Sequence, residues 1–138
     1  MTELTFIGGG RGGERSQVAG RDAFRPERIE QLRALLGAAR LDALLGLMAS
    51  ECRERPALVR RGQERGDMAA VHAEARHLLG AAISIGAGAI GEAALRLQSA
   101  PDLERAGPLI DALDVAARDT LDAARALLAA SAGRHGGL

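Results

Sequence analysis

Residues 66–98, GDMAAVHAEARHLLGAAISIGAGAIGEAALRLQ, decide the fold of this 138-residue chain. Apolar residues recur in this stretch at three- and four-residue steps, which is the spacing of one face of an α-helix. The first apolar stripe consists of Val71, Leu78, Ala82 and Ile85. Asp67 stands before this stripe as a natural N-cap, and Gly86 and Gly88 interrupt the pattern after it. The second stripe consists of Ile90, Ala94 and Leu97. The stretch therefore predicts two consecutive helices.

Three further helical patterns flank this pair. They run from Pro26 to Gly37, from about Leu41 to Gly62 or Gly66, and from about Pro108 to residue 132. Pro26 suits the first turn of a helix, whereas Pro56 lies inside the second pattern and should bend that helix. Five helical segments with short connections predict an all-α fold, an antiparallel four-helix bundle with a short N-terminal leader helix.

The composition supports a fold without sheets. The chain contains 29 Ala and 20 Leu, and its two Phe lie within the first 24 residues. Sheets favour β-branched and aromatic residues, whereas Ala, Leu, Arg and Glu are good helix formers. All 18 basic residues are Arg, and the chain contains neither Lys nor Asn. A helical core built from small and medium aliphatic side chains follows, with 47% apolar content to fill it.

The charges and the cysteine count exclude several classes of function. The 18 basic and 18 acidic residues give a formal net charge of zero, so no broad field attracts nucleic acid or an anionic membrane. The single Cys52 excludes an internal disulfide framework and a cysteine-based zinc site, and its place on an apolar stripe predicts an inert core thiol. The uncharged run 78–91 is too short to span a bilayer.

Both ends of the chain are expected to lie outside the bundle, which should span residues 23–132. Residues 1–22 read as a flexible, glycine-rich arm, and residues 133–138 as a frayed tail. Glycines 8, 10 and 13 satisfy a dinucleotide-binding pattern, but no strand and helix flank them as that motif requires. Without an early basic and apolar stretch, no secretory signal is indicated, so we expect a cytoplasmic protein.

The helix over residues 67–85 carries a second surface opposite its apolar stripe. With Arg76 at its centre, the residues within about 60° around the helix axis include His72, Leu79, Gly80 and Ile83. A glycine inside a helix costs roughly 1 kcal/mol relative to Ala, which suggests that something approaches the backbone closely at Gly80. Close packing between helices of this protein is an equally good reason for the glycine.

In these residues the chain resembles the histidine phosphotransfer (HPt) domain. The family pattern is a Gly-Asp helix start, then His-x-Leu-Lys-Gly-Ser, followed on the next helix by Gly-Ala and a later Leu. The matching residues in register are Asp67, Leu78, Gly80, Gly86, Ala87, Ile90 and Leu97. With the helix order included, the resemblance covers about residues 24–131. It implies docking to receiver domains of response regulators or hybrid histidine kinases, and transfer of a phosphoryl group through a histidine.

The site departs from the family pattern at two positions. Arg76 occupies the position of the phosphoacceptor histidine, and Leu79 that of the lysine. A guanidinium stays protonated and has no lone pair to attack phosphorus, and Leu removes a charge that would stabilise phosphate. The resemblance therefore implies a pseudo-HPt of a two-component phosphorelay. Its docking surface would consist of His72, Arg76, Leu79, Gly80 and Ile83.

Two other functions remain open. Phosphotransfer could use His72 or His77 as the acceptor, which would make the chain at most a phosphotransfer protein without ATP-dependent kinase activity. The chain could instead be a structural or dimerising helical bundle, present as a monomer or a homodimer. No cofactor is indicated. No metal site is indicated either, because His72 and His77 lie five residues apart, about 140° around a helix.

Overall fold

The computed structural model describes residues 23–136, and within them every regular element is an α-helix. The helices are α2 (Pro26–Leu36), α3 (Ala38–Glu64), α4 (Met68–Ile85), α5 (Gly88–Gln98) and α6 (Leu103–Gly136). The predicted all-α class is confirmed for this part of the chain. The predicted arm at residues 1–22 lies outside the described residues.

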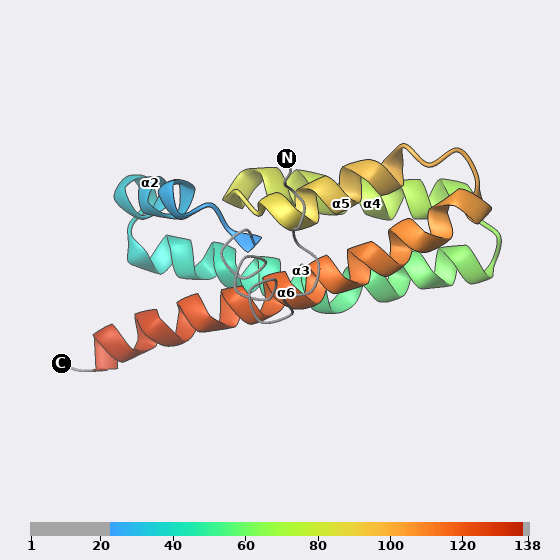
Figure 1. The fold of residues 1–138 in the computed structure, drawn as a ribbon. Helices are drawn as coiled ribbons and strands as arrows, with labels where there is room; N and C mark the ends of the chain where they lie inside the picture. Colours follow the sequence, from blue (N-terminus) through green and yellow to red (C-terminus); the bar gives the residue numbers. More distant parts are fainter. Residues whose placement is uncertain (1–22, 137–138) are drawn as a thin grey trace, which may run out of the picture.

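The most extensive contacts between helices join α3 to α6, α4 to α5, α3 to α4 and α5 to α6. Figure 1 shows α4 and α5 side by side, with α3 and α6 forming the layer beneath them. The short α2 lies on α3 and also contacts α4. One continuous core therefore fills the space between the two layers, and the outward face of α4 remains exposed.

The core consists of aliphatic side chains, as the composition predicts. The predicted stripe of α4 is buried: Val71, Leu78, Ala82 and Ile85 are each at most 2% exposed. Small residues allow α3 and α4 to approach closely, since a Cβ added at Gly62 would lie 3.1 Å from Cγ2 of Val71. The buried stripe fixes which face of α4 points outward.

Glycine and backbone hydrogen bonds hold the start of α2 against the end of α4. Gly86 ends α4 with φ of +75°, in the left-handed region that favours glycine. A Cβ at this position would lie 2.5 Å from Cγ of Arg28 in α2. The N–H of Arg25 donates to the carbonyl of Gly86 at 3.0 Å. The leader helix is therefore fastened beside the outward face of α4.

The beginnings of α2 and α4 agree with the sequence predictions. Pro26 begins α2, and the Asp67 carboxylate accepts the N–H of Ala70 at 3.0 Å, as an N-cap should. The helix α3 starts at Ala38, earlier than predicted, and continues through Pro56 to Glu64.

The predicted bounds of the last helix were wrong at both ends. The helix begins at Leu103, before the predicted Pro108, because Asp102 caps it: its carboxylate accepts the N–H of Arg105 at 2.9 Å. It also continues to Gly136, beyond the predicted end at residue 132. The buried Ser131 hydroxyl donates to Asp42 at 2.7 Å, which fastens this part of α6 to α3.

Candidate functional site

The outward face of α4 presents the residues that the sequence singles out around Arg76. Arg76 and Gly80 are exposed, Leu79 is half-buried, and Ile83 is 68% exposed. Within residues 23–136, Arg76 makes no hydrogen bond or ion pair. The face thus combines the large exposed side chain of Ile83 with an available guanidinium, about two helical turns apart.

Gly80 has no role in packing the described helices together. A Cβ built at this position meets no atom of them within 4 Å. The φ angle of Gly80 is not positive, so an alanine could adopt the same backbone conformation. Of the two reasons given for the glycine, close packing between helices of this protein is therefore wrong for the described residues.

A groove of about 880 Å³ extends this face toward α5. Leu79 and Ile83 line it from α4, and Gly91 and Leu95 line it from α5. Leu95 is 52% exposed and was missed by the sequence reasoning. Leu95 lies off the stripe of buried residues in α5, and this position in the sequence pattern indicates an exposed side chain. The groove has apolar side chains in its walls, and the charged residues Arg25, Glu27 and Glu92 also line it.

His72 does not present a free imidazole on this face. Its ring is half-buried, and Nε2 lies 2.8 Å from the carbonyl oxygen of Ala100, in the connection between α5 and α6. A carbonyl only accepts, so Nε2 must carry the proton and Nδ1 alone keeps a lone pair. The expectation that His72 is simply exposed beside Arg76 therefore needs correction.

His77 lies beside an ion-pair cluster between α3 and α4, as its position around the helix suggests. Its Nε2 is 3.2 Å from Oε1 of Glu51. Arg55 joins the carboxylates of the two helices, at 3.0 Å from Glu51 and 2.6 Å from Glu74. The sequence alone gave Glu74 no partner. The imidazole of His77 is 52% exposed but is directed to this cluster rather than to the Arg76 face.

Electrostatics in the cluster favour the charged form of the Glu51 carboxylate. Burial by itself raises the pKa of Glu51, but the hydrogen bond and charge of Arg55, followed by those of His77, outweigh it. The net effect holds the pKa of Glu51 below its ordinary value. Cys52, the next residue, is buried, and burial together with the Glu51 charge raises its pKa to about 12. The prediction of a buried, unreactive thiol is confirmed.

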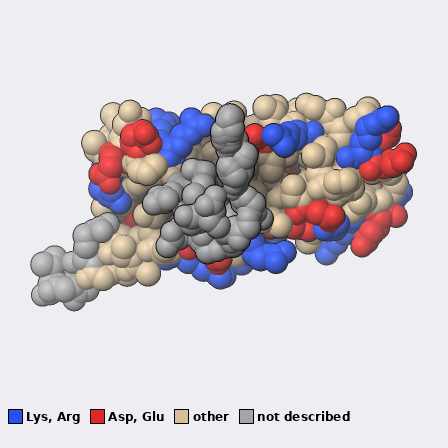
Figure 2. All heavy atoms as spheres, viewed as in Figure 1, with Lys and Arg blue, Asp and Glu red and all other residues tan. Residues whose placement is uncertain are grey.

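The surface carries no strong field of one sign on the side that Figure 2 shows. Acidic and basic side chains alternate there over the described helices. In residues 23–136, no three His, Cys, Asp or Glu side chains come together to hold a metal ion. No helix of this region is long and apolar enough to cross a membrane. The Arg76 face and its groove combine exposed apolar side chains with a guanidinium that has no ion-pair partner within residues 23–136.

Comparison of the chain with protein-family models, curated proteins and solved structures gives no match. The interpretation of the site therefore rests on its residues and their geometry.

Proposed function

We propose that this chain is a pseudo-HPt that binds receiver domains through the outward face of α4. In this proposal, α3, α4, α5 and α6 form an antiparallel four-helix bundle, and α2 is its leader helix. The cycle of contacts from α3 through α4, α5 and α6 back to α3 supports this arrangement. As a partner of receiver domains of response regulators or hybrid histidine kinases, the protein would act in the cytoplasm.

The open space at Gly80 carries the proposal. A helical glycine lowers stability by roughly 1 kcal/mol relative to Ala, and no packing within the described helices offsets that loss at this position. Gly80 lies between Arg76 and the exposed Ile83, where a docked surface would approach the backbone. A binding face accounts for all three residues together.

The chemistry of Arg76 favours binding without transfer. Arg76 stays protonated and is therefore a poor nucleophile toward a phosphorylated aspartate, but its guanidinium suits an acidic pocket on a partner. Leu79 and Ile83 supply apolar contact beside it. Such a protein would occupy the docking surface of a receiver and so compete with catalytically active phosphotransfer domains.

Binding to receiver domains tests the proposal directly. Titration calorimetry would use a panel of purified receiver domains from the same genome, with and without beryllofluoride to mimic the phosphoryl group. We expect Arg76→Glu to weaken the bound complex by about 2 kcal/mol, roughly 30-fold in Kd. Arg118→Glu is the matched control, since Arg118 is exposed on α6 and makes no ion pair within residues 23–136. Absence of binding to every receiver, or equal losses in both variants, would refute the proposal.

Phosphotransfer through His72 or His77 remains a separate proposal with its own readout. Incubation with a phosphorylated receiver would leave an acid-labile label on the protein, removed by His72→Ala or His77→Ala. For His72 the attacking atom would have to be Nδ1, since Nε2 faces the carbonyl of Ala100. If the chain is instead a dimerising bundle, sedimentation would show a homodimer that Arg76→Glu dissociates.

A further inference from the structure

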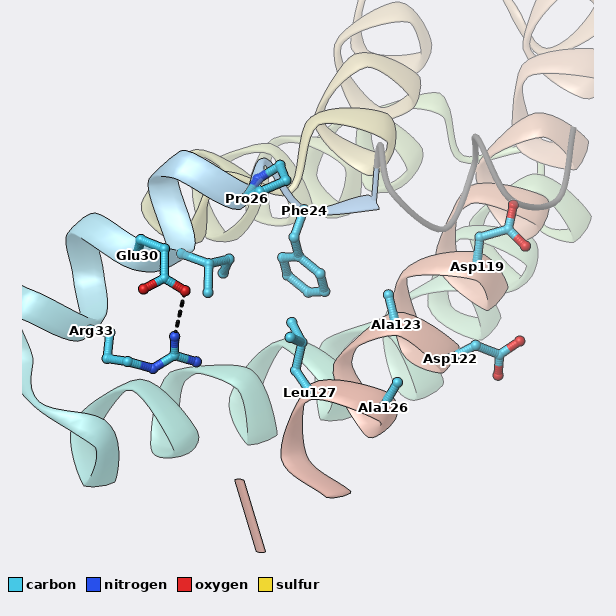
Figure 3. A pocket seen from close by; sticks show the side chains of 10 residues that line it. Phe24, Pro26, Glu30, Arg33, Asp119, Asp122, Ala123, Ala126 and Leu127 are labelled. Atoms are coloured by element: carbon cyan, nitrogen blue, oxygen red, sulfur yellow. Dashed lines mark hydrogen bonds and ion pairs between the residues drawn. The ribbon is translucent and has the colours of Figure 1, made fainter. Parts of the chain in front are cut away.

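A second groove lies between α6 and the segment that leads into α2. Its volume is about 630 Å³. The apolar side chains that line it are Phe24, Pro26, Ile29, Ala123, Ala126 and Leu127. Figure 3 shows the ring of Phe24 directed across the groove toward Leu127. The groove is thus suited to an apolar segment.

The two rims of this groove differ in charge. On the α2 side, Glu30 and Arg33 neutralise each other in an ion pair of 2.8 Å. On the α6 side, Asp119 and Asp122 make no ion pair within the described part of the chain. Figure 3 shows both carboxylates at the edge of the groove. An occupant that follows its apolar part with basic residues would complement this acidic rim.

We propose that residues 4–7, Leu-Thr-Phe-Ile, of the same molecule occupy this groove. They contain three of the few large apolar residues that precede Phe24 in the chain. Residues 8–22, which follow them, carry Arg11, Arg15 and Arg21 against Glu14 and Asp22, a net charge of +1, and these arginines can approach Asp119 and Asp122. The occupant therefore matches the groove in both apolar character and charge.

The place where residues 1–22 join the described body makes this contact easy to form. They join it at Ala23, and the next residue, Phe24, lines the groove. A glycine-rich span of about 18 residues, as between Phe6 and Phe24, has an average end-to-end distance of about 23 Å. A segment tethered at this distance is present at an effective concentration on the order of millimolar. A weak apolar contact is thereby favoured over an equally weak contact with a separate molecule.

The contact would act beside the proposed docking surface. Pro26 lines this groove and also the groove of the Arg76 face. Docking of residues 4–7 would brace residues 24–27, which border both grooves. This influence on partner binding rests on the proposed function, whereas the intramolecular docking does not, so the two can fail separately.

Disulfide formation between introduced cysteines tests the docking in the full chain. Thr5→Cys would be combined with Ala126→Cys at the groove, or with Ala112→Cys as the matched control. Both alanines are exposed on α6, about 21 Å apart along the helix. The native Cys52 does not interfere because it is buried.

We expect the disulfide to residue 126 to form at least tenfold faster than the disulfide to residue 112 within one chain. Adding Phe6→Ala should reduce this ratio to within about twofold. A nitroxide on Thr5→Cys should likewise broaden the amide signals of residues 123–127 more than those of residues 109–113. Equal rates and uniform broadening, as expected if a small ligand fills the groove, would overturn the proposal. Disulfides formed only between two chains would overturn it in favour of a second copy.

Discussion

Replacement of Gly80 by Ala should stabilise the protein and weaken its partner binding at the same time. The added methyl group meets no atom of the described helices within 4 Å, and the backbone there is helical. The substitution therefore gains the difference in helix propensity, about 0.5–1 kcal/mol, without a steric loss. For a domain of this size that gain raises Tm by about 2–5 °C.

Two other glycines give matched controls for this prediction. Gly46 of α3 also has no atom within 4 Å of an added Cβ, so Gly46→Ala should stabilise the protein by a similar amount. Gly62 is buried, and its Cβ would lie 3.1 Å from Val71, so Gly62→Ala should destabilise. The three variants separate the effect of helix propensity from that of local space.

Urea unfolding followed by circular dichroism measures the stabilities, and calorimetry with a receiver domain measures the binding. We expect Gly80→Ala to weaken receiver binding about tenfold, equivalent to about 1.4 kcal/mol, whereas Gly46→Ala leaves it unchanged. If Gly80→Ala destabilises the protein, the position is not open as the structure indicates. If it stabilises the protein and binds receivers as tightly as before, Gly80 does not lie in the docking surface.

Two further predictions concern the bundle itself. Gly86→Ala should destabilise by about 1–3 kcal/mol in the same urea assay, because Ala is strained at φ of +75° and its Cβ would collide with Arg28; an unchanged midpoint would contradict this. Glu51→Gln should lower the free energy of unfolding by about 1 kcal/mol at pH 7, where the charged carboxylate binds Arg55 and His77. Because folding lowers the pKa of Glu51, the difference in free energy of unfolding should be complete above the pKa of the unfolded state, about 4.3. It should disappear as the pH falls through the lower pKa of the folded state. A difference in free energy that persists unchanged at pH 2.5 would contradict the assigned cause.

The elements that follow from local chemistry could be predicted from the sequence. The N-cap at Asp67 and the helix end at Gly86 are set by residues within a few positions of the boundary. The buried stripe of α4 can also be predicted, because its apolar residues recur at three- and four-residue steps and so share the one face of the helix that must be covered. These features fixed the outward face around Arg76 before any tertiary contact was known.

The features that depend on contacts between helices could not be predicted in this way. His72 and Arg76 share a face by periodicity, but the Ala100 carbonyl that holds the imidazole comes from 28 residues further along the chain. Glu74 likewise has no partner within its own helix and finds Arg55 on α3. The early start of α6 has a different cause. The sequence pattern places the first helical residue at Pro108, whereas the N-cap at Asp102 initiates the helix and Pro108 lies inside it.

The residue at position 79 separates two explanations for the missing lysine: a change in phosphate-binding chemistry, and a bias in the amino-acid composition of the whole chain. A genome that avoids lysine codons would replace a phosphate-binding lysine by arginine and so keep the charge. The chain instead has Leu79, which packs against the hydrophobic core and lines the groove beside Ile83. Substitution of charge by apolar surface favours a face that holds a partner over one that stabilises a phosphoryl group. If the proposed pseudo-HPt function is correct, Arg76 and Leu79 together favour binding of a partner over phosphotransfer. The double variant Arg76→His with Leu79→Lys should keep the fold, because Arg76 is exposed and a lysine at the half-buried position 79 can keep its aliphatic stem against the core while its ammonium group reaches solvent. If the scaffold descends from an active phosphotransfer domain, that variant should accept a phosphoryl group from a receiver that binds the native chain, whereas no acid-labile label on a folded variant would contradict this descent.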